Sequence, residues 1–216
     1  MSRAKNVIGI YSVACVLIDR IRTGWKDWGV ARERVESVAE HTFKEAILAI
    51  GIDSEFDYDI DIFKVVYMIV IHDIAEALIG DLTPFQISRE EKKKLEHEAI
   101  RKIFKGLLKG EEIIALFLEF DARKTPEAKF AYMCDKLECD LQCKRYDMEH
   151  CVDLNNQENN KTFYNERVQE LLKEGNSWSD MWIKFDMERV PYDENFKEIL
   201  QYAMEKGVSS DLVEAP

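Results

Sequence analysis

Two histidines and two aspartates stand where the apolar pattern of the chain predicts core or near-core side chains: His41, His72, Asp73 and Asp135. A charged side chain in such a position needs a partner, because burying an unpaired charge is costly. Imidazole nitrogens and carboxylate oxygens are also donors that divalent transition metals accept. The four residues therefore favour a site for one divalent ion, with Mn, Co, Fe, Ni and Zn as the candidates.

The local sequence is consistent with convergence of these side chains on one centre. His72 and Asp73 directly follow the apolar run 65–71. Neighbouring side chains of a helix diverge by about 100°, so both can reach one centre only if it lies between their directions. Asp135 lies one position round from the apolar stripe of its own helix, between small residues four positions away on either side. His41 would add a ligand from a third helix.

Hydrophobic periodicity predicts helices as the elements that position these residues. One helix begins at a capping box formed by Ser37 and Glu40 and is expected to close at Gly51. The run 62–79 is predicted to be one buried helix that stops at Gly80. The buried stripe of the helix after Ser37 is predicted to be Ala39, Phe43, Ala46, Ile47 and Ile50. We expect helices at 5–21, 37–50, 62–79, 88–108, 111–120, 125–148, 162–174, 179–188 and 194–206.

The remaining segments are predicted to be turns, loops and solvent-exposed faces. Gly24 is expected to stop the first helix, and the polar segment 155–160 to form a loop. The charge run Glu-Glu-Lys-Lys-Lys at 90–94 predicts a face in contact with solvent. We therefore expect an all-α protein with a single domain over 1–216. Its core is expected at about 7–150, and a C-terminal helical extension at about 155–206.

Composition argues against several classes of protein. The chain of 216 residues is 46% hydrophobic and has only 9 Gly and 4 Pro, unlike a disordered or an all-β protein. Its net charge of -12 argues against binding to a nucleic acid polymer or an anionic membrane. Five cysteines without a CxxC pair fit reduced thiols in the cytoplasm. We expect a cytoplasmic protein with a small-molecule partner.

Four short sequences resemble the H…HD…D pattern of the HD-domain metal-dependent phosphohydrolases: VAEH at 38–41, IHDIAE at 71–76, GD at 80–81 and CDKL at 134–137. The resemblance implies an all-α bundle in which the two histidines and two aspartates ligate one divalent metal ion.

Three further sequences resemble the 5′-deoxynucleotidase branch of that superfamily: RTGW at 22–25, HDIAEALIGD at 72–81 and EAKF at 127–130. Members of this branch remove phosphate from deoxynucleoside 5′-monophosphates, so the resemblance implies a nucleotide substrate and a homodimer. The chain departs from the best-studied bacterial form, where the Arg and Trp are adjacent, because Thr23 and Gly24 separate Arg22 from Trp25.

Four other residues are candidates for catalysis and substrate binding. Glu76, four residues after His72, would project from the same side of the helix and suits general acid/base work, unless it is an exposed helix residue. Asp81 could orient a water or accept a sugar hydroxyl, or it could be an ordinary turn residue. Arg22 could bind phosphate through its guanidinium, and Trp25 could offer an apolar ring surface to a sugar or base. Alternatively, either residue could serve only to end a helix.

Two other functions stay open at this point. One is an HD-type phosphohydrolase for another nucleotide such as guanosine tetraphosphate, although the Glu-Asp pair of that family is not evident after the HD helix. The other is a non-catalytic, metal-stabilised nucleotide-binding protein, against which the presence of Glu76 and Asp81 weighs.

Overall fold

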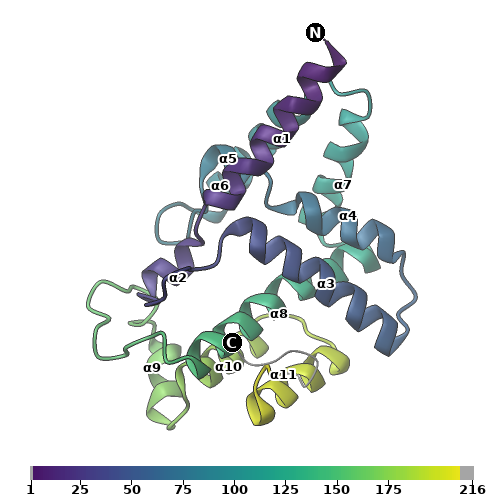
Figure 1. Ribbon diagram of the computed structural model, residues 1–216. Helices are drawn as coiled ribbons and strands as arrows, with labels where there is room; N and C mark the ends of the chain where they lie inside the picture. The colour runs from purple at the N-terminus through teal and green to yellow at the C-terminus, as the bar shows by residue number, and fades with distance from the viewer. Residues whose placement is uncertain (1, 210–216) are drawn as a thin grey trace. The chain divides into compact units, whose positions relative to one another are not determined.

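The computed structural model describes residues 2–209, which form α-helices and one isolated β-bridge, between Ile21 and Ser37 (Figure 1). The all-α expectation is confirmed. None of the described helices combines the length and the apolar character that a membrane crossing requires. In chain order the helices are α1 (Arg3–Asp19), α2 (Thr23–Asp27), α3 (Val38–Phe56), α4 (Ile62–His72), α5 (Glu76–Ile79), α6 (Arg89–Phe104), α7 (Gly110–Ala122), α8 (Pro126–Met148), α9 (Glu166–Lys173), α10 (Trp178–Met187) and α11 (Glu194–Lys206).

The described residues fall into two compact units. The first unit consists of the chain up to Gly24 and of Val35–Asp135. It holds α1, α3 to α7 and the beginning of α8. The second unit consists of Trp25–Arg34 and the chain from Lys136 onward, with the rest of α8 and α9 to α11. The single domain expected from the sequence stays a prediction.

The first unit has a continuous apolar core. In it α1 packs against α3, α5 and α6, α4 packs against α3 and α7, and α6 packs against α7. The apolar residues next to the HD pair take part in this core, so the same packing that stabilises the unit also positions the polar pair. The buried members are Leu17, Val38, Ile71, Ile74, Ala77, Ile100, Phe104, Ile114 and Phe117.

Helix α3 begins where the sequence predicts and ends later. The Ser37 hydroxyl accepts the Glu40 N–H, and the Glu40 carboxylate accepts the Ser37 N–H, which confirms the capping box. The predicted end at Gly51 is wrong, because α3 continues to Phe56. A glycine inside a helix costs only about 1 kcal/mol relative to alanine, so tertiary packing overrides it. The helix ends instead at Asp57, in the left-handed conformation with φ 50°.

The predicted buried stripe of α3 is wrong. Phe43, Ile47 and Ile50 are 67%, 55% and 48% exposed, and the two alanines of the stripe are half-buried. The helix instead buries a face that includes two polar side chains. The spacing of apolar residues does not predict the buried face of α3, because that face carries polar side chains as well as apolar ones. The buried residues of α3 are Val38, His41, Glu45, Ala49 and Ile52.

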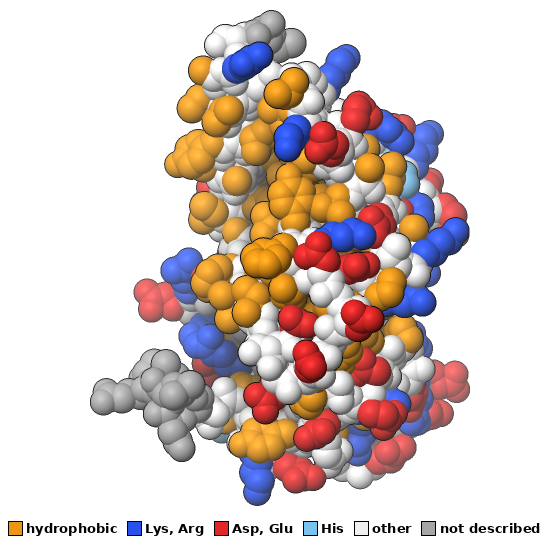
Figure 2. Space-filling view, turned by 90° about the vertical axis from the view of Figure 1, so that its right-hand side faces the viewer, with side chains coloured by type: hydrophobic (Ala, Val, Ile, Leu, Met, Phe, Trp, Pro, Cys, Tyr) orange, Lys and Arg blue, Asp and Glu red, His pale blue; other side chains and the backbone are white. Residues whose placement is uncertain are grey.

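The apolar residues that α3 exposes have counterparts on neighbouring helices. Exposed side chains follow one another at helical spacing on α1, α3 and α4, and α3 packs against both of the other helices. Figure 2 shows hydrophobic side chains gathered over the upper part of one face of the molecule. We call the set the apolar surface of the first unit. Its members are Val7, Ile8 and Tyr11 on α1, Phe43, Ile47 and Ile50 on α3, and Phe63, Tyr67 and Val70 on α4.

The predicted helix over 62–79 is interrupted, which corrects that expectation. Helix α4 ends at His72, residues 73–75 form a turn, and α5 begins at Glu76. In the turn the Ile74 N–H donates to the carbonyl three residues earlier, at 3.2 Å. At this end of α4 the side chains of His72 and Asp73 meet, with His72 Nε2 3.2 Å from Asp73 Oδ2. The stop at Gly80 is confirmed, with φ 89°.

Other boundaries differ by a few residues, and one short helix was not expected. Helix α6 ends at Phe104, shortly before Gly106, whose φ is 84°. Helix α9 begins at Glu166 rather than at 162, because the Asn165 side chain caps it. Residues Thr23–Asp27 form α2, where the sequence predicts only a helix stop. In the second unit α10 packs against α9 and α11.

Candidate metal centre and active site

Helix α3 contributes two buried polar side chains from one face. His41 directly follows Glu40 of the capping box, and Glu45 comes four residues after His41. Both side chains have no solvent exposure. The i, i+4 spacing places them one above the other, and the His41 Nε2 atom lies 3.7 Å from the Glu45 Oε2 atom.

The end of α4 contributes His72 and Asp73. His72 Nε2 lies 3.2 Å from Asp73 Oδ2 and 3.6 Å from Glu45 Oε2. His72 Nδ1 lies 2.7 Å from the Ile69 carbonyl oxygen. A carbonyl can only accept, so Nδ1 carries the hydrogen and Nε2 keeps its lone pair when the imidazole is neutral. The ring therefore presents Nε2 to the cluster in the form that a metal ion requires.

Helix α8 supplies the last carboxylate. Asp135 Oδ1 lies 3.3 Å from His41 Nε2, and Asp73 Oδ2 lies 3.8 Å from the same nitrogen. One ligand atom from each of His41, Glu45, His72 and Asp135 lies within 4.8 Å of the others. The structure thus brings together the four residues predicted from the sequence and adds Glu45. The two nitrogens and three carboxylates have the donor types and the spacing that suit a divalent metal ion.

The electrostatics of the cluster fit a cation. Burial raises the pKa of Glu45 to about 8, although both imidazoles oppose that shift. Burial would lower the pKa of His72, but Asp73 and Glu45 together raise it well above its ordinary value. For Asp73, burial acts to raise the pKa, yet His72 holds it below the usual range. These opposed shifts show that the carboxyl and imidazole groups interact strongly with one another, and a bound divalent cation would favour the carboxylate form of Glu45 and the neutral form of His72.

Arg22 lies beside the cluster. The Ile21–Ser37 bridge holds its segment against the start of α3, and the Arg22 N–H donates to the Glu36 carbonyl at 3.1 Å. Its guanidinium Nη1 lies 3.6 Å from Asp73 Oδ2, and its Nε lies 3.9 Å from Glu36 Oε2. A cationic group is therefore fixed next to a candidate metal ligand.

Glu76 is a buried residue, and the exposed-helix alternative is wrong for it. Its side chain, 3% exposed at the start of α5, lies with Oε1 3.3 Å from the Lys92 ammonium. Burial, with the charges of Asp73 and Asp81, raises the pKa of Glu76 well above its ordinary value. Burial opposes the charged form of Lys92, but Glu76 and Asp73 raise its pKa nevertheless. A carboxyl that holds a proton readily, beside a cation, suits proton transfer.

Lys92 corrects the expectation of a purely solvated charged face on α6. Its side chain is half-buried and also lies 3.7 Å from Glu96 Oε1, whereas its neighbours in the charge run are exposed. No sequence signal marks Lys92, since a charge run gives no information about which member turns inward. Glu45 does have a signal in the sequence, its i, i+4 spacing from His41.

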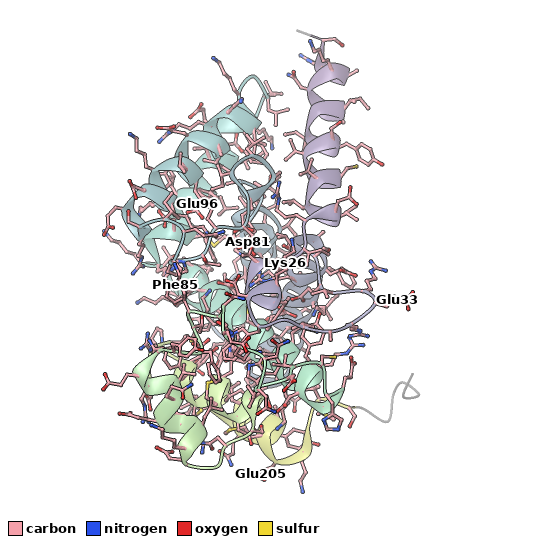
Figure 3. The ribbon with its side chains drawn as sticks, turned by 90° about the vertical axis from the view of Figure 1, so that its left-hand side faces the viewer. Lys26, Glu33, Asp81, Phe85, Glu96 and Glu205 are labelled. Atoms are coloured by element: carbon pink, nitrogen blue, oxygen red, sulfur yellow. The ribbon has the colours of Figure 1, made fainter. Side chains whose placement is uncertain are left out.

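Asp81 follows α5 and connects two segments of the first unit by hydrogen bonds. It is labelled in Figure 3, as is Glu96 on α6. Its Oδ2 accepts the Thr23 N–H at 2.6 Å, and its carbonyl accepts the Thr23 hydroxyl at 2.7 Å. Asp81 thus holds the residue next to Arg22. These contacts are those of a positioning residue, and its predicted role toward water or a sugar stays a prediction.

Trp25 belongs to the second unit. Its indole is 2% exposed, and its ring centroid lies 5.3 Å from that of Tyr146, 6.5 Å from that of Trp178 and 5.4 Å from that of Trp182. These contacts make it part of an aromatic core. Its predicted role as an apolar plate for sugar or base stays a prediction.

Comparison with known proteins gives consistent matches. A family model for the HD domain matches residues 17–176. A 5′-deoxynucleotidase of Schizosaccharomyces pombe is 38% identical over 156 residues, 68% of this chain and 76% of its own length. Another, of Dictyostelium discoideum, is 35% identical over 152 residues, 67% of this chain and 79% of its own length. A solved structure of a Pyrococcus horikoshii protein matches with a TM-score of 0.66 at 24% identity, covering 92% of this chain and 98% of that one.

Proposed function

Since the chain belongs to the HD-domain family, as the sequence resemblance predicted, we propose that it is a metal-dependent phosphohydrolase that removes the 5′-phosphate from deoxynucleoside 5′-monophosphates. The observation that carries the proposal is the buried cluster in which His41, His72 and Asp135 meet Asp73, with Arg22 fixed beside it. The names of the relatives support the choice of substrate.

In this proposal His41, His72, Asp73 and Asp135 hold one divalent ion, with Mn, Co, Fe, Ni and Zn as the candidates. Such an ion would act as a Lewis acid toward a phosphate oxygen or would lower the pKa of a water bound to it. The hydrogen bond from His72 Nδ1 to the Ile69 carbonyl orients that ring for its role.

The other residues act on the substrate and on protons. Arg22 binds phosphate oxygens, because its guanidinium is a cation that stays charged at any physiological pH. Glu76 takes a proton from the attacking water and delivers one to the departing 5′-oxygen. Lys92, 3.3 Å from Glu76 Oε1, orients that carboxylate. Asp81 holds the Arg22 segment through Thr23 and is our candidate for selection of deoxyribose over ribose. Trp25 is a separate candidate for contact with the sugar or base.

The test is phosphate release from a panel of deoxynucleoside and ribonucleoside 5′-monophosphates, each assayed with Mn, Co, Mg and Zn. We expect turnover that depends on the metal and is higher for the deoxynucleotides. Equal or higher turnover of AMP and GMP would remove the deoxynucleotidase assignment and leave a phosphohydrolase. Absence of turnover with every metal, by protein that contains metal, would favour the non-catalytic alternative.

We also propose a homodimer that forms through the apolar surface of the first unit. Monomeric soluble proteins rarely expose a contiguous apolar patch of more than a few hundred Å². A two-fold axis would bring the stripes of α1, α3 and α4 against their own copies. We propose a cytoplasmic location as well, because none of the five described cysteines forms a disulfide and four of them are buried.

A further inference from the structure

Glu45 is a buried acid whose carboxylate has no hydrogen-bond partner among the described residues. Its side chain has no solvent exposure, and neither carboxylate oxygen has a hydrogen-bond partner within residues 2–209. Burying a carboxylate without hydrogen bonds is strongly unfavourable. A leucine or methionine would fill the same volume on α3 without that cost, so the acidic group at this position needs an explanation.

The surroundings of Glu45 point to a shared ion. Its Oε2 lies 3.7 Å from His41 Nε2 and 3.6 Å from His72 Nε2. Asp73 Oδ2 lies 3.8 Å and 3.2 Å from the same two nitrogens. Ligand atoms about 2.1 Å from one ion are roughly 3.0 Å apart at 90° and roughly 3.4 Å apart at the tetrahedral angle. Three of the four distances are a few tenths of an ångström longer than these values, so the side chains would have to move inward to bind one ion. The carboxylates of Glu45 and Asp73 lie at similar distances from the two imidazoles.

We propose that Glu45 is a fifth side-chain ligand of the metal ion and that it selects for an octahedral ion such as Mn²⁺ over tetrahedral Zn²⁺. A structural zinc site is complete with four ligands, and zinc prefers nitrogen and sulfur donors. Carboxylate-rich, six-coordinate sites suit manganese. Two imidazoles and three carboxylates leave one octahedral position, for either a water or a single phosphate oxygen, so Arg22 must bind the other phosphate oxygens. The inference rests on the metal site of the proposed function and is independent of its substrate.

The experiment compares Glu45→Gln with the parent in the absence of nucleotide. Glutamine keeps the size and hydrogen-bonding groups of a protonated glutamate and lacks the negative charge. Glu55→Gln makes the same change at an exposed position of α3 and controls for net charge. Dissociation constants for Mn²⁺ and Zn²⁺ are measured by competition with a chelator, and circular dichroism checks the helix content.

We expect Glu45→Gln to weaken Mn²⁺ binding by at least about tenfold, the smallest effect usual for removing a group that supports a metal site. Zn²⁺ binding should weaken less, and Glu55→Gln should leave both unchanged. Unchanged Mn²⁺ affinity in Glu45→Gln would show that Glu45 is a neutral buried acid and would overturn the inference. A parent that binds neither ion would overturn the metal site itself, so the two failures are distinguishable.

A second measurement covers the case in which Glu45→Gln does not fold. In a crystal structure of the parent loaded with Mn²⁺, we expect a Glu45 oxygen within about 2.0–2.6 Å of the ion, the range of carboxylate–metal bonds. An ion held by His41, His72, Asp73 and Asp135, with both Glu45 oxygens well outside that range, would overturn the proposal.

Discussion

Glu76→Gln separates a catalyst from a protein that only holds a metal. The side chain is 3% exposed, and its Oε1 has the Lys92 ammonium 3.3 Å away. Glutamine has the same size, and its amide oxygen can still accept from Lys92, so the fold should persist. What the substitution removes is a group that exchanges a proton. Positioned proton-transfer groups contribute about 10²–10⁴ in rate, and each factor of ten is about 1.4 kcal/mol, so we expect a barrier raised by roughly 3–5.5 kcal/mol.

The assay is steady-state phosphate release from a deoxynucleoside 5′-monophosphate, with metal content measured on the same samples. We expect kcat to fall by the stated factor, while KM changes much less because the metal site and Arg22 are intact. Glu96→Gln is the matched control, since Glu96 also contacts Lys92, at 3.7 Å, and we give it no proton to transfer. Its kcat should change by less than about tenfold, or 1.4 kcal/mol.

A Glu76→Gln variant with full metal content and near-parental kcat would refute the reasoning, and Asp81 would become the leading candidate. A comparable loss in Glu96→Gln would instead indicate that the position of Lys92, rather than proton transfer by Glu76, limits the reaction.

Removing the metal should destabilise the protein. An ion present at a hundred times its Kd raises the free energy of unfolding by about 2.7 kcal/mol. For a chain of this size, that corresponds to a melting temperature roughly 5–10 °C higher. Differential scanning calorimetry with and without a chelator measures this, and identical melting temperatures would contradict a metal that links α3, α4 and α8. Phe43→Glu should convert the dimer to a monomer in analytical ultracentrifugation, whereas Tyr202→Glu, at a similarly exposed position on α11, should not; a monomeric parent would contradict the dimer. In the second unit, burial and the charge of Asp186 raise the pKa of Asp140, whose carboxylate accepts the Tyr192 hydroxyl at 2.7 Å. The folded state therefore binds the Asp140 proton more tightly than the unfolded state, so this residue's contribution to stability is full below the unfolded pKa and is lost as pH rises toward the folded pKa. The free energy of unfolding, measured by chemical denaturation, should fall less between pH 5 and pH 8 for Asp140→Asn than for the parent. An equal fall in both proteins would contradict a raised pKa of Asp140.

Local sequence determined the existence of most helices and several of their ends. Ser37 and Glu40 cap α3 as predicted, because a capping box needs only residues three positions apart. Gly80 ends α5 with a positive φ that glycine adopts without strain. The types and order of His41, His72, Asp73 and Asp135 were sufficient to predict a metal site, since few other reasons place such residues in apolar surroundings.

Tertiary structure decided which faces turn inward. Periodicity predicted that Phe43 and Ile47 would be buried, but α3 directs His41 and Glu45 inward because the cluster they form needs partners from α4 and α8. Which face of α3 turns inward depends on residues distant in the chain, so the spacing of its apolar residues alone does not predict that face.

The break between α4 and α5 and the contact of Lys92 with Glu76 have the same origin. Every residue of 73–75 is compatible with a helix, so the local sequence does not predict the turn that follows His72. Lys92 lies in a run of similar charged residues, and the position of α6 against α5 selects it for burial. Local sequence thus determined the helices and the chemical groups, while packing between distant segments determined which groups meet.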